Sequence, residues 1–303
     1  MKLYAVKTVD VLGVPNGSYS FAKSEEAAHD VVFLTGASGA GKTRFLEMIV
    51  AARELLTTGE REPHGLGFIR PGNRSAKVVL SWELDAEERA TIGSKGPIAS
   101  TEVIFQEDEE DDTDSRMRFL IERYAHDDET PKFEYFSERR RLDVGGGGAS
   151  LDEAEQLYLR TDSSPRKFSW VPAFLEELPD RPESASRFAD LVGRLSGTAA
   201  YDLERHVLTS KGRVLSALEQ LTASEADAVM FASTATLVGL SRSIVLIDRP
   251  ELHGLEPARA MDGLSALGSK NQLILATGSP AFVASGPGVV VELGPHARDS
   301  RSA

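Results

Sequence analysis

The chain has 303 residues, of which 41% are hydrophobic, and this is enough for one large domain or two ordinary ones with a real core. Its net charge of −13 argues against a protein that coats nucleic acid, although a local basic groove stays open. The absence of cysteine excludes disulfides and thiolate metal sites. No apolar run approaches the length of a membrane span, so we expect a cytoplasmic protein without membrane insertion.

The first third of the sequence predicts mostly strands. Alternating or continuous apolar residues, bounded by turn signals, predict strands at 2–14, 18–22, 30–35, 76–84, 101–105 and 117–124. A helix with apolar residues at helical spacing is expected at 44–53. The early strands have no crossover helices between them, which predicts an added N-terminal antiparallel sheet.

Between the strand at 30–35 and the helix at 44–53 lies G-A-S-G-A-G-K-T, a full match to the phosphate-loop pattern known as Walker A. Its residues are Gly36, Ala37, Ser38, Gly39, Ala40, Gly41, Lys42 and Thr43. Glycines let successive N–H groups converge on phosphate at a helix start, where the helix dipole favours negative charge. Lys42 is expected to reach the β- and γ-phosphates of ATP, and the Thr43 hydroxyl to bind Mg²⁺.

The middle of the chain is less informative. The acidic run Glu107–Asp112 has two interpretations, a metal site or a solvated hairpin tip, and we favour the tip. Gly145–Gly148 predicts a flexible break, and helical patterns dominate from 151 to 221. We therefore expect a helical subdomain inserted at about 145–225.

The last third predicts alternating helices and strands. Strands are expected at 243–248, 272–277 and 289–293, and a frayed tail at 295–303. Alternation of this kind indicates a mainly parallel sheet covered on both faces. The sequence thus predicts an α/β P-loop NTPase fold, organised as a single domain over residues 1–303.

The strand at 243–248 carries the second half of the nucleotide site. Ile244–Ile247 are apolar and Asp248 follows them, which is the Walker B pattern of an acid that holds Mg²⁺ through water at a strand's carboxyl end. The alternative is a core strand that ends in a helix cap. The upstream phosphate loop favours the Mg²⁺ interpretation.

Several segments resemble ABC-type ATPases of the SMC/RecF-like and overcoming-lysogenization-defect-like groups. I-V-L-I-D-R-P-E-L-H at 244–253 is similar to their D-E-P-E-L-H segment, and Leu221–Glu225 looks like their L-S-x-G-E signature. Leu275–Pro280 resembles their T-H-S-P switch, and Tyr135–Arg140 is similar to an Arg-bearing segment. The order and spacing of these segments are the specific part of the resemblance.

The resemblance implies an ABC-type fold and a mechanism. Two such domains would associate head to tail around ATP, as a homodimer or a heteromer. The signature of one, through Thr222 and the backbone near Ser224, would touch the γ-phosphate held by the other. The resemblance also implies a separate protein partner or effector.

Three positions depart from the family pattern. Arg249 stands where the catalytic glutamate is expected, and a guanidinium, which has donors and no acceptor, cannot take a proton from water. Gly278 replaces the switch histidine, and Ser224 replaces the signature glycine. No convincing glutamine completes the Mg²⁺ site, Gln106 being a weak candidate.

Other residues could compensate for the missing base. Glu251 is a candidate substitute base, with a helix cap or a buried structural acid as the alternative. His253 could also act as a base, although a packed or capping histidine is its other interpretation. Arg249 could clamp phosphate like an arginine finger, or bind a partner's carboxylate.

The sequence therefore leaves ATP hydrolysis undecided. Our first hypothesis is an ATP-gated dimer that regulates a protein partner and hydrolyses ATP slowly or not at all. The second is a competent ATPase that works on DNA, in repair or phage defence, and the third a scaffold in which nucleotide is structural. A small-molecule kinase and a transporter ATPase are more distant. The Arg139–Arg141 cluster is expected at the surface or near phosphate rather than in a DNA groove.

Overall fold

The computed structural model describes residues 1–57, 64–106, 115–126, 132–142 and 160–294. The chain divides into two compact units. Unit 1 comprises 1–130, 274–278 and 288–303, and unit 2 comprises 131–273 and 279–287. The acidic run at 107–112, the glycines at 145–148 and the tail at 295–303 lie outside the described residues, so the predictions made for them stay predictions.

Unit 1 contains the predicted N-terminal antiparallel sheet, with strand order β2-β1-β4-β5. Its strands are β1 (Lys2–Val9), β2 (Gly17–Ser20), β4 (Ser75–Glu83) and β5 (Ile98–Gln106). Along β4 buried residues alternate with more exposed ones, as expected for a sheet with one face on the core. The first strand ends at Val9, five residues earlier than the sequence predicts.

The five-stranded sheet has the order β12-β3-β11-β10-β6. Its strands are β3 (Val31–Thr35), β6 (Phe133–Phe136), β10 (Ile244–Asp248), β11 (Gln272–Ala276) and β12 (Val289–Glu292). The β12–β3 and β10–β6 pairs are both parallel. Strands β6, β10 and β11 are buried throughout, which is why they read as unbroken apolar runs.

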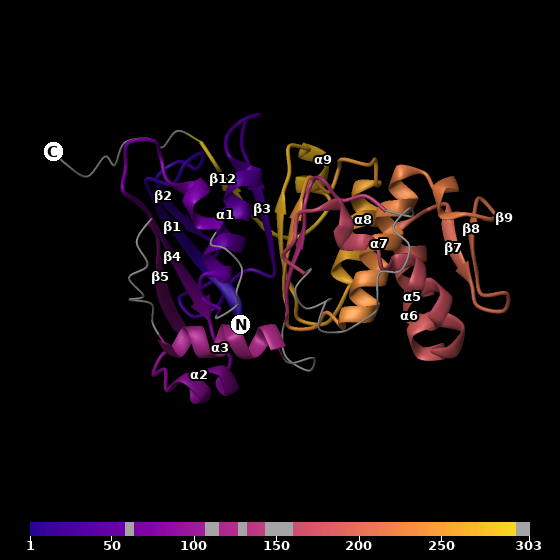
Figure 1. Ribbon diagram of the computed structural model, residues 1–303, viewed down its shortest axis with the longest axis horizontal. Coiled ribbons are helices and arrows are strands. Elements are labelled where there is room, and N and C mark those ends of the chain that lie inside the picture. The colour runs from indigo at the N-terminus through magenta and orange to yellow at the C-terminus, as the bar shows by residue number, and fades with distance from the viewer. Residues whose placement is uncertain (58–63, 107–114, 127–131, 143–159, 295–303) are drawn as a thin grey trace. The chain divides into compact units, whose positions relative to one another are not determined.

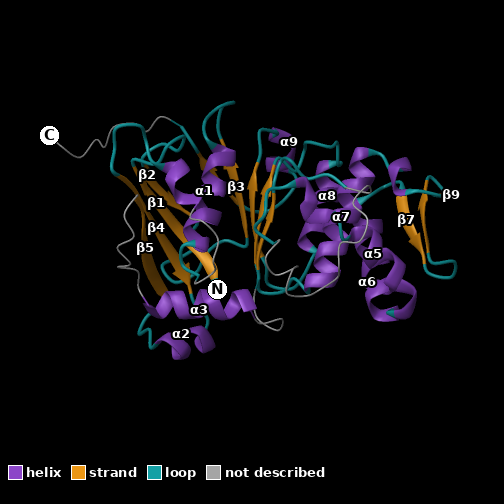
Figure 2. Ribbon diagram, in the orientation of Figure 1, coloured by secondary structure: helices purple, strands orange, loops and turns teal. Residues whose placement is uncertain are grey.

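The described residues also form α-helices and 3-10 helices, and Figure 2 colours the helices purple. The α-helices are α1 (Lys42–Glu54), α2 (Ala86–Ile92), α3 (Ser115–His126), α5 (Val171–Glu177), α6 (Pro182–Leu195), α7 (Ala223–Val238), α8 (Pro257–Ser265) and α9 (Pro280–Ala284). The 3-10 helices are η1 (His64–Phe68), η2 (Pro165–Phe168), η3 (Leu178–Asp180) and η4 (Leu218–Gln220). None of these helices is long and apolar enough to cross a bilayer.

The segment at 117–124 is a helix, α3, and the prediction of a returning strand was wrong. Met117, Leu120, Ile121 and Tyr124 are buried, a spacing of three and four residues that matches a helix face. Phe119, which a strand of this register would place with Met117 and Ile121, is 57% exposed. Figure 1 shows α2 and α3 side by side.

Unit 2 is less helical between 151 and 221 than the sequence predicts. Helices α5 and α6 are present, but residues 199–214 form a three-stranded antiparallel sheet. Its strands are β7 (Ala199–Asp202), β8 (Val207–Ser210) and β9 (Arg213–Val214). These strands are too short to show a clear alternation of two, which is why the periodicity did not reveal them.

Candidate functional site

The phosphate loop of unit 1 has the backbone that its glycines permit. Gly41, with φ 93°, is the cap residue before α1, and Gly36 has φ 140°. A Cβ on Gly41 would lie 2.2 Å from the Gly13 carbonyl oxygen, and one on Gly36 would lie 2.3 Å from the Leu293 carbonyl oxygen. Neither position has room for a side chain, so both glycines are required by the fold of the loop.

The same loop fits a phosphate ligand. Helix α1 begins at Lys42, has no acidic residue in its first turn, and follows the exposed residues Ala37–Gly39. A helix start of this kind attracts anions through its N–H groups and its dipole. The Lys42 ammonium donates to the carbonyl oxygens of Gly36 at 2.8 Å and Ala37 at 3.1 Å, so it bends back over the loop. Thr43, the predicted Mg²⁺ ligand, stands in the first turn.

The predicted Walker B acid ends a buried strand of unit 2. All five residues of β10 are buried, and Asp248 is fully so. Strand β6 runs parallel beside β10, and Phe136 pairs with Ile247. The carboxyl ends of these strands therefore bring Asp248 close to the segment that follows β6, at the sheet edge where open α/β folds bind ligands.

Arg249 follows Asp248 in a left-handed conformation, with φ 49°. Its side chain is 49% exposed, and its Nη1 lies 3.6 Å from a carboxylate oxygen of Glu138. An exposed pair of this length contributes little to stability. The position of the expected catalytic glutamate therefore carries a cation that faces solvent beside an acid of its own chain.

Glu251 and His253 belong to the turn that follows Arg249. Glu251 is half-buried, and the next helix, α8, starts at Pro257 with Glu256 as its cap. The interpretation of Glu251 as a helix cap was therefore wrong, since Glu256 has that place. The Nδ1 of His253 lies 2.8 Å from Asp227 Oδ1, which agrees with the interpretation of a packed histidine.

The segment that resembles the signature opens α7. The exposed Thr222 caps the helix: its hydroxyl oxygen accepts from the Glu225 amide, and the Glu225 carboxylate accepts from the Thr222 amide, which completes a capping box. Ser224 stands in the first turn, where its hydroxyl lies 3.3 Å from that of Thr222. Burial would raise the pKa of Glu225, but hydrogen bonds from Ser210, Thr198 and Thr222 outweigh it and hold the pKa at about 2.

The switch segment follows β11. The Thr277 amide donates to the Leu34 carbonyl oxygen at 3.0 Å, and Gly278 is exposed with no side chain to offer. Ser279 caps the short helix α9. Gln106, the weak candidate for completing a Mg²⁺ site, is the last residue of β5 in the antiparallel sheet.

Arg140 is the functional candidate that sequence reasoning missed. The Arg139–Arg141 cluster was expected at the surface or near phosphate, but only Arg139 and Arg141 are exposed, and the Arg140 side chain is fully buried. It forms an ion pair with Asp227 of α7, 87 residues away. The segment resemblance at Tyr135–Arg140 was the only signal of its importance.

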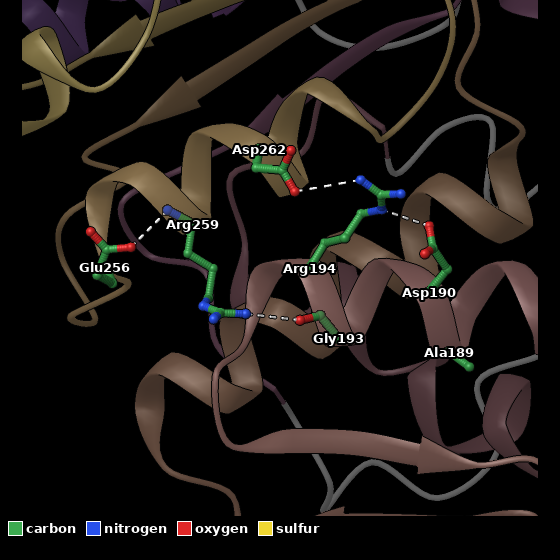
Figure 3. Close-up of a pocket in the computed structure, with 7 residues that line it drawn as sticks. All are labelled: Ala189, Asp190, Gly193, Arg194, Glu256, Arg259 and Asp262. Carbon is green, nitrogen blue, oxygen red and sulfur yellow. Dashed lines mark hydrogen bonds and ion pairs between the residues drawn. The ribbon is translucent and has the colours of Figure 1, made fainter.

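A polar pocket of unit 2 lies between α6 and α8 (Figure 3). It is lined by Ala189, Asp190, Gly193, Arg194, Glu256, Arg259 and Asp262. Its two arginines already have partners within it: Arg194 bridges Asp190 and Asp262, and Arg259 donates to the Gly193 carbonyl oxygen. None of the predicted nucleotide residues lines this pocket. Among the described residues there is also no cluster of three or more His, Asp or Glu side chains that could hold a metal ion.

No family model matches the sequence, and neither does any curated protein. The fold is similar to that of solved structures. The recombination mediator protein RecF, solved as RecF-ATPrS, aligns with a TM-score of 0.51 and 11% identity over 96% of this chain and 97% of that one. The SMC head domain from Thermotoga maritima aligns with a TM-score of 0.48 and 12% identity over 96% and 94% of the two chains.

The likeness to RecF shows the fold. The chain has the mixed α/β architecture of RecF, which is the ABC-type fold that the segment resemblance implies. The predicted fold class is therefore confirmed. The predicted roles of individual residues in binding Mg²⁺ and ATP stay predictions.

Proposed function

We propose that this protein is a Mg-ATP-dependent switch: nucleotide held by the phosphate loop closes a dimer, and hydrolysis by the chain alone is slow or absent. The observation that carries the proposal is the contrast between two sites. The phosphate loop has the backbone and helix start of a nucleotide site. The residue after Asp248 is a left-handed, exposed arginine.

Slow hydrolysis follows from the chemistry of the replaced residues. A missing general base costs a factor of about 10²–10⁴ in rate. Gly278 removes a second side chain that the family uses at the γ-phosphate. In the proposed site Lys42 holds the phosphates, Thr43 and Asp248 hold Mg²⁺, and the exposed Thr222 of one chain meets the nucleotide of the other.

The proposed partner is a protein, and the proposed location is the cytoplasm. A DNA-binding role has less support in this chain. The net charge is −13, and burial of Arg140 in an ion pair removes it from any basic surface at 139–141. The dimer can be a homodimer or a heteromer in which another chain supplies the missing base.

Binding and association test the proposal directly. Titration calorimetry with Mg-ATP is expected to show binding that Lys42→Ala weakens about 100-fold. Sedimentation velocity is expected to show a Mg-ATP-dependent rise in mass, which EDTA reverses. Absence of nucleotide binding by the wild-type protein would overturn the proposal, and binding without a rise in mass would exclude the homodimer.

A competent ATPase is the second candidate, because Glu251 is neither buried nor used as a helix cap. If Glu251 acts as the base, Glu251→Gln will abolish phosphate release and leave Mg-ATP affinity unchanged. If the switch proposal holds, the same change will leave an already low rate unaltered.

A further inference from the structure

The buried guanidinium of Arg140 uses all of its hydrogen-bonding capacity. Its Nε and Nη2 donate to the two carboxylate oxygens of Asp227 at 3.1 and 3.0 Å. Its Nη1 donates to the carbonyl oxygens of Ser137 at 3.1 Å and Asp248 at 2.6 Å, and Nη2 also donates to that of Arg249 at 3.0 Å. Arginine carries five N–H donors in a fixed plane, and here each has an acceptor.

The acceptors come from three segments that are far apart in sequence. Asp227 lies in α7, two residues beyond the capping box of the signature. The carbonyl oxygens of Asp248 and Arg249 belong to the end of β10 and the turn after it. Ser137 belongs to the loop after β6. One rigid side chain therefore joins the start of α7 to the end of the Walker B strand.

Asp227 is bound from a second side as well. Its Oδ1 lies 2.8 Å from Nδ1 of His253, and His253 stands in the turn that begins at Arg249. The turn is thus attached to α7 twice, through backbone carbonyl oxygens to Arg140 and through an imidazole to Asp227. A carboxylate with no exposed surface requires partners of this kind, because an unpaired buried charge is strongly unfavourable.

The network also fixes an unfavourable backbone. Arg249 has φ 49°, a conformation that residues other than glycine, asparagine and aspartate rarely adopt. Such conformations persist where the surrounding structure determines them. The bond from Arg140 to the Arg249 carbonyl oxygen is one such determinant, and it acts on the residue in the catalytic glutamate's place.

The start of α7 is also bound by hydrogen bonds through Glu225. Glu225 Oε1 accepts hydrogen bonds from the hydroxyls of Thr198 and Ser210, each at 2.6 Å. These two residues flank or belong to the sheet β7-β8-β9. The start of α7 is therefore bound to this sheet through Glu225 and to the turn after Asp248 through Asp227. A displacement of either one is expected to displace the exposed Thr222.

We infer that Arg140 is a positioning residue, which makes the signature end of α7 and the turn after Asp248 respond to nucleotide as one unit. The inference rests on the proposed ATP-gated switch. A shift of the turn when Mg-ATP binds near Asp248 is passed by Arg140 and Asp227 to Thr222, on the surface that meets a second chain. Arg140 touches neither nucleotide nor Mg²⁺ in this account.

A second buried ion pair of unit 2 supplies a matched control. Lys167 pairs with Glu134, and the ammonium also donates to the carbonyl oxygens of Tyr135 and Arg160. Both charged groups are buried, as in the Arg140–Asp227 pair. None of these contacts involves α7 or the turn after Asp248. Asp227→Asn and Glu134→Gln are therefore the same chemical change, and only the first removes a carboxylate that connects α7 to the turn after Asp248.

The experiment compares these variants by hydrogen exchange and by association. Without nucleotide, Asp227→Asn is expected to speed amide exchange in both 223–230 and 248–254, whereas Glu134→Gln speeds it in neither. With Mg-ATP, Asp227→Asn is expected to weaken self-association about tenfold while nucleotide affinity stays within about threefold of wild type. Arg140→Lys, which keeps the charge but offers three donors, should act in the same direction if Asp227→Asn does not fold.

Two results would overturn the inference. One is faster exchange in 223–230 alone, because the turn would then be independent of the helix. The other is an equal loss of association in Glu134→Gln at an equal loss of thermal stability. If wild-type protein binds Mg-ATP but never self-associates, the homodimer form of the proposed function fails, and the exchange comparison without nucleotide still decides whether the link exists.

Discussion

The phosphate loop matches the residue pattern expected of an ATPase, whereas the turn after Asp248 departs from it. In the loop, Gly36 and Gly41 stand where any side chain would collide with backbone, and Lys42 begins the helix. In the turn, an arginine with φ 49° occupies the place of a base, and its backbone is held by Arg140. The comparison teaches that holding nucleotide and activating water are separable tasks, and we propose that this chain retains the groups for the first.

The largest expected effect tests the loop. Gly41→Ala places a Cβ 2.2 Å from the Gly13 carbonyl oxygen at φ 93°. Strain and displacement together should lower the free energy of unfolding by about 3 kcal/mol or more and abolish ATP binding, as measured by denaturant titration and calorimetry. Gly39→Ala is the matched control, because φ is 79° but nothing lies within 4 Å. An equal loss in both variants would show that the close approach at Gly41 is unimportant.

The second largest effect is expected at the start of α7, the helix that Arg140 links to the turn after Asp248. The pKa of Glu225 is held at about 2, below its ordinary value of 4.5. Its contribution to stability is therefore present above about pH 4.5 and is lost as the pH falls toward 2. Glu225→Gln should lower the free energy of unfolding by about 3 kcal/mol at neutral pH, because an amide cannot accept all four hydrogen bonds.

Denaturant titrations from pH 7 to pH 2 would show this as a gap between the two proteins that narrows below about pH 4.5. Glu256→Gln is the control, since the pKa of Glu256 is also lowered, by the Arg259 and Ala258 amides, but at an exposed helix cap. A gap for Glu225→Gln that is independent of pH would contradict the assignment.

A somewhat smaller effect is expected at Lys42. Its ammonium bends over the loop toward the Gly36 and Ala37 carbonyl oxygens, so removing it should leave the fold intact. Lys42→Ala should weaken Mg-ATP binding about 100-fold, because charge-assisted hydrogen bonds to phosphate are lost. Lys42→Arg is the control for charge, and Kd values from calorimetry are the readout. Unchanged affinity in Lys42→Ala would show that Lys42 does not bind the phosphates of ATP.

The sequence predicted the elements that depend on neighbouring residues and missed the contacts that depend on residues far apart in the chain. The phosphate-loop pattern, α1 and β10 were predicted because each depends on consecutive residues. The helix at 117–124 was mistaken for a strand because a short apolar run fits both periods.

The Arg140 network was out of reach for the opposite reason. Three of its four acceptor residues lie 87, 108 and 109 residues further along the chain, and only the tertiary packing of α7 and of β10 brings them to the segment after β6. Three consecutive arginines look alike in the sequence, yet only the middle one is buried. The neighbouring residues in the sequence do not distinguish an arginine at the surface from a buried arginine with five hydrogen-bond acceptors.

The smallest expected change addresses the altered turn. Arg249→Glu should raise phosphate release about tenfold over Arg249→Gln, because a carboxylate can accept the proton from water. The gain is below the full value of a general base, since Gly278 is unchanged and the left-handed backbone at 249 directs the side chain differently. Equal rates in the two variants would show that the missing carboxylate is not what limits turnover.

The central claim is tested most directly by steady-state phosphate release from Mg-ATP by the wild-type protein, with Lys42→Ala as the blank. The account predicts release no faster than the blank, from a protein that binds Mg-ATP in the same buffer. Turnover well above the blank would contradict it, and would show that the chain activates water despite Arg249 and Gly278.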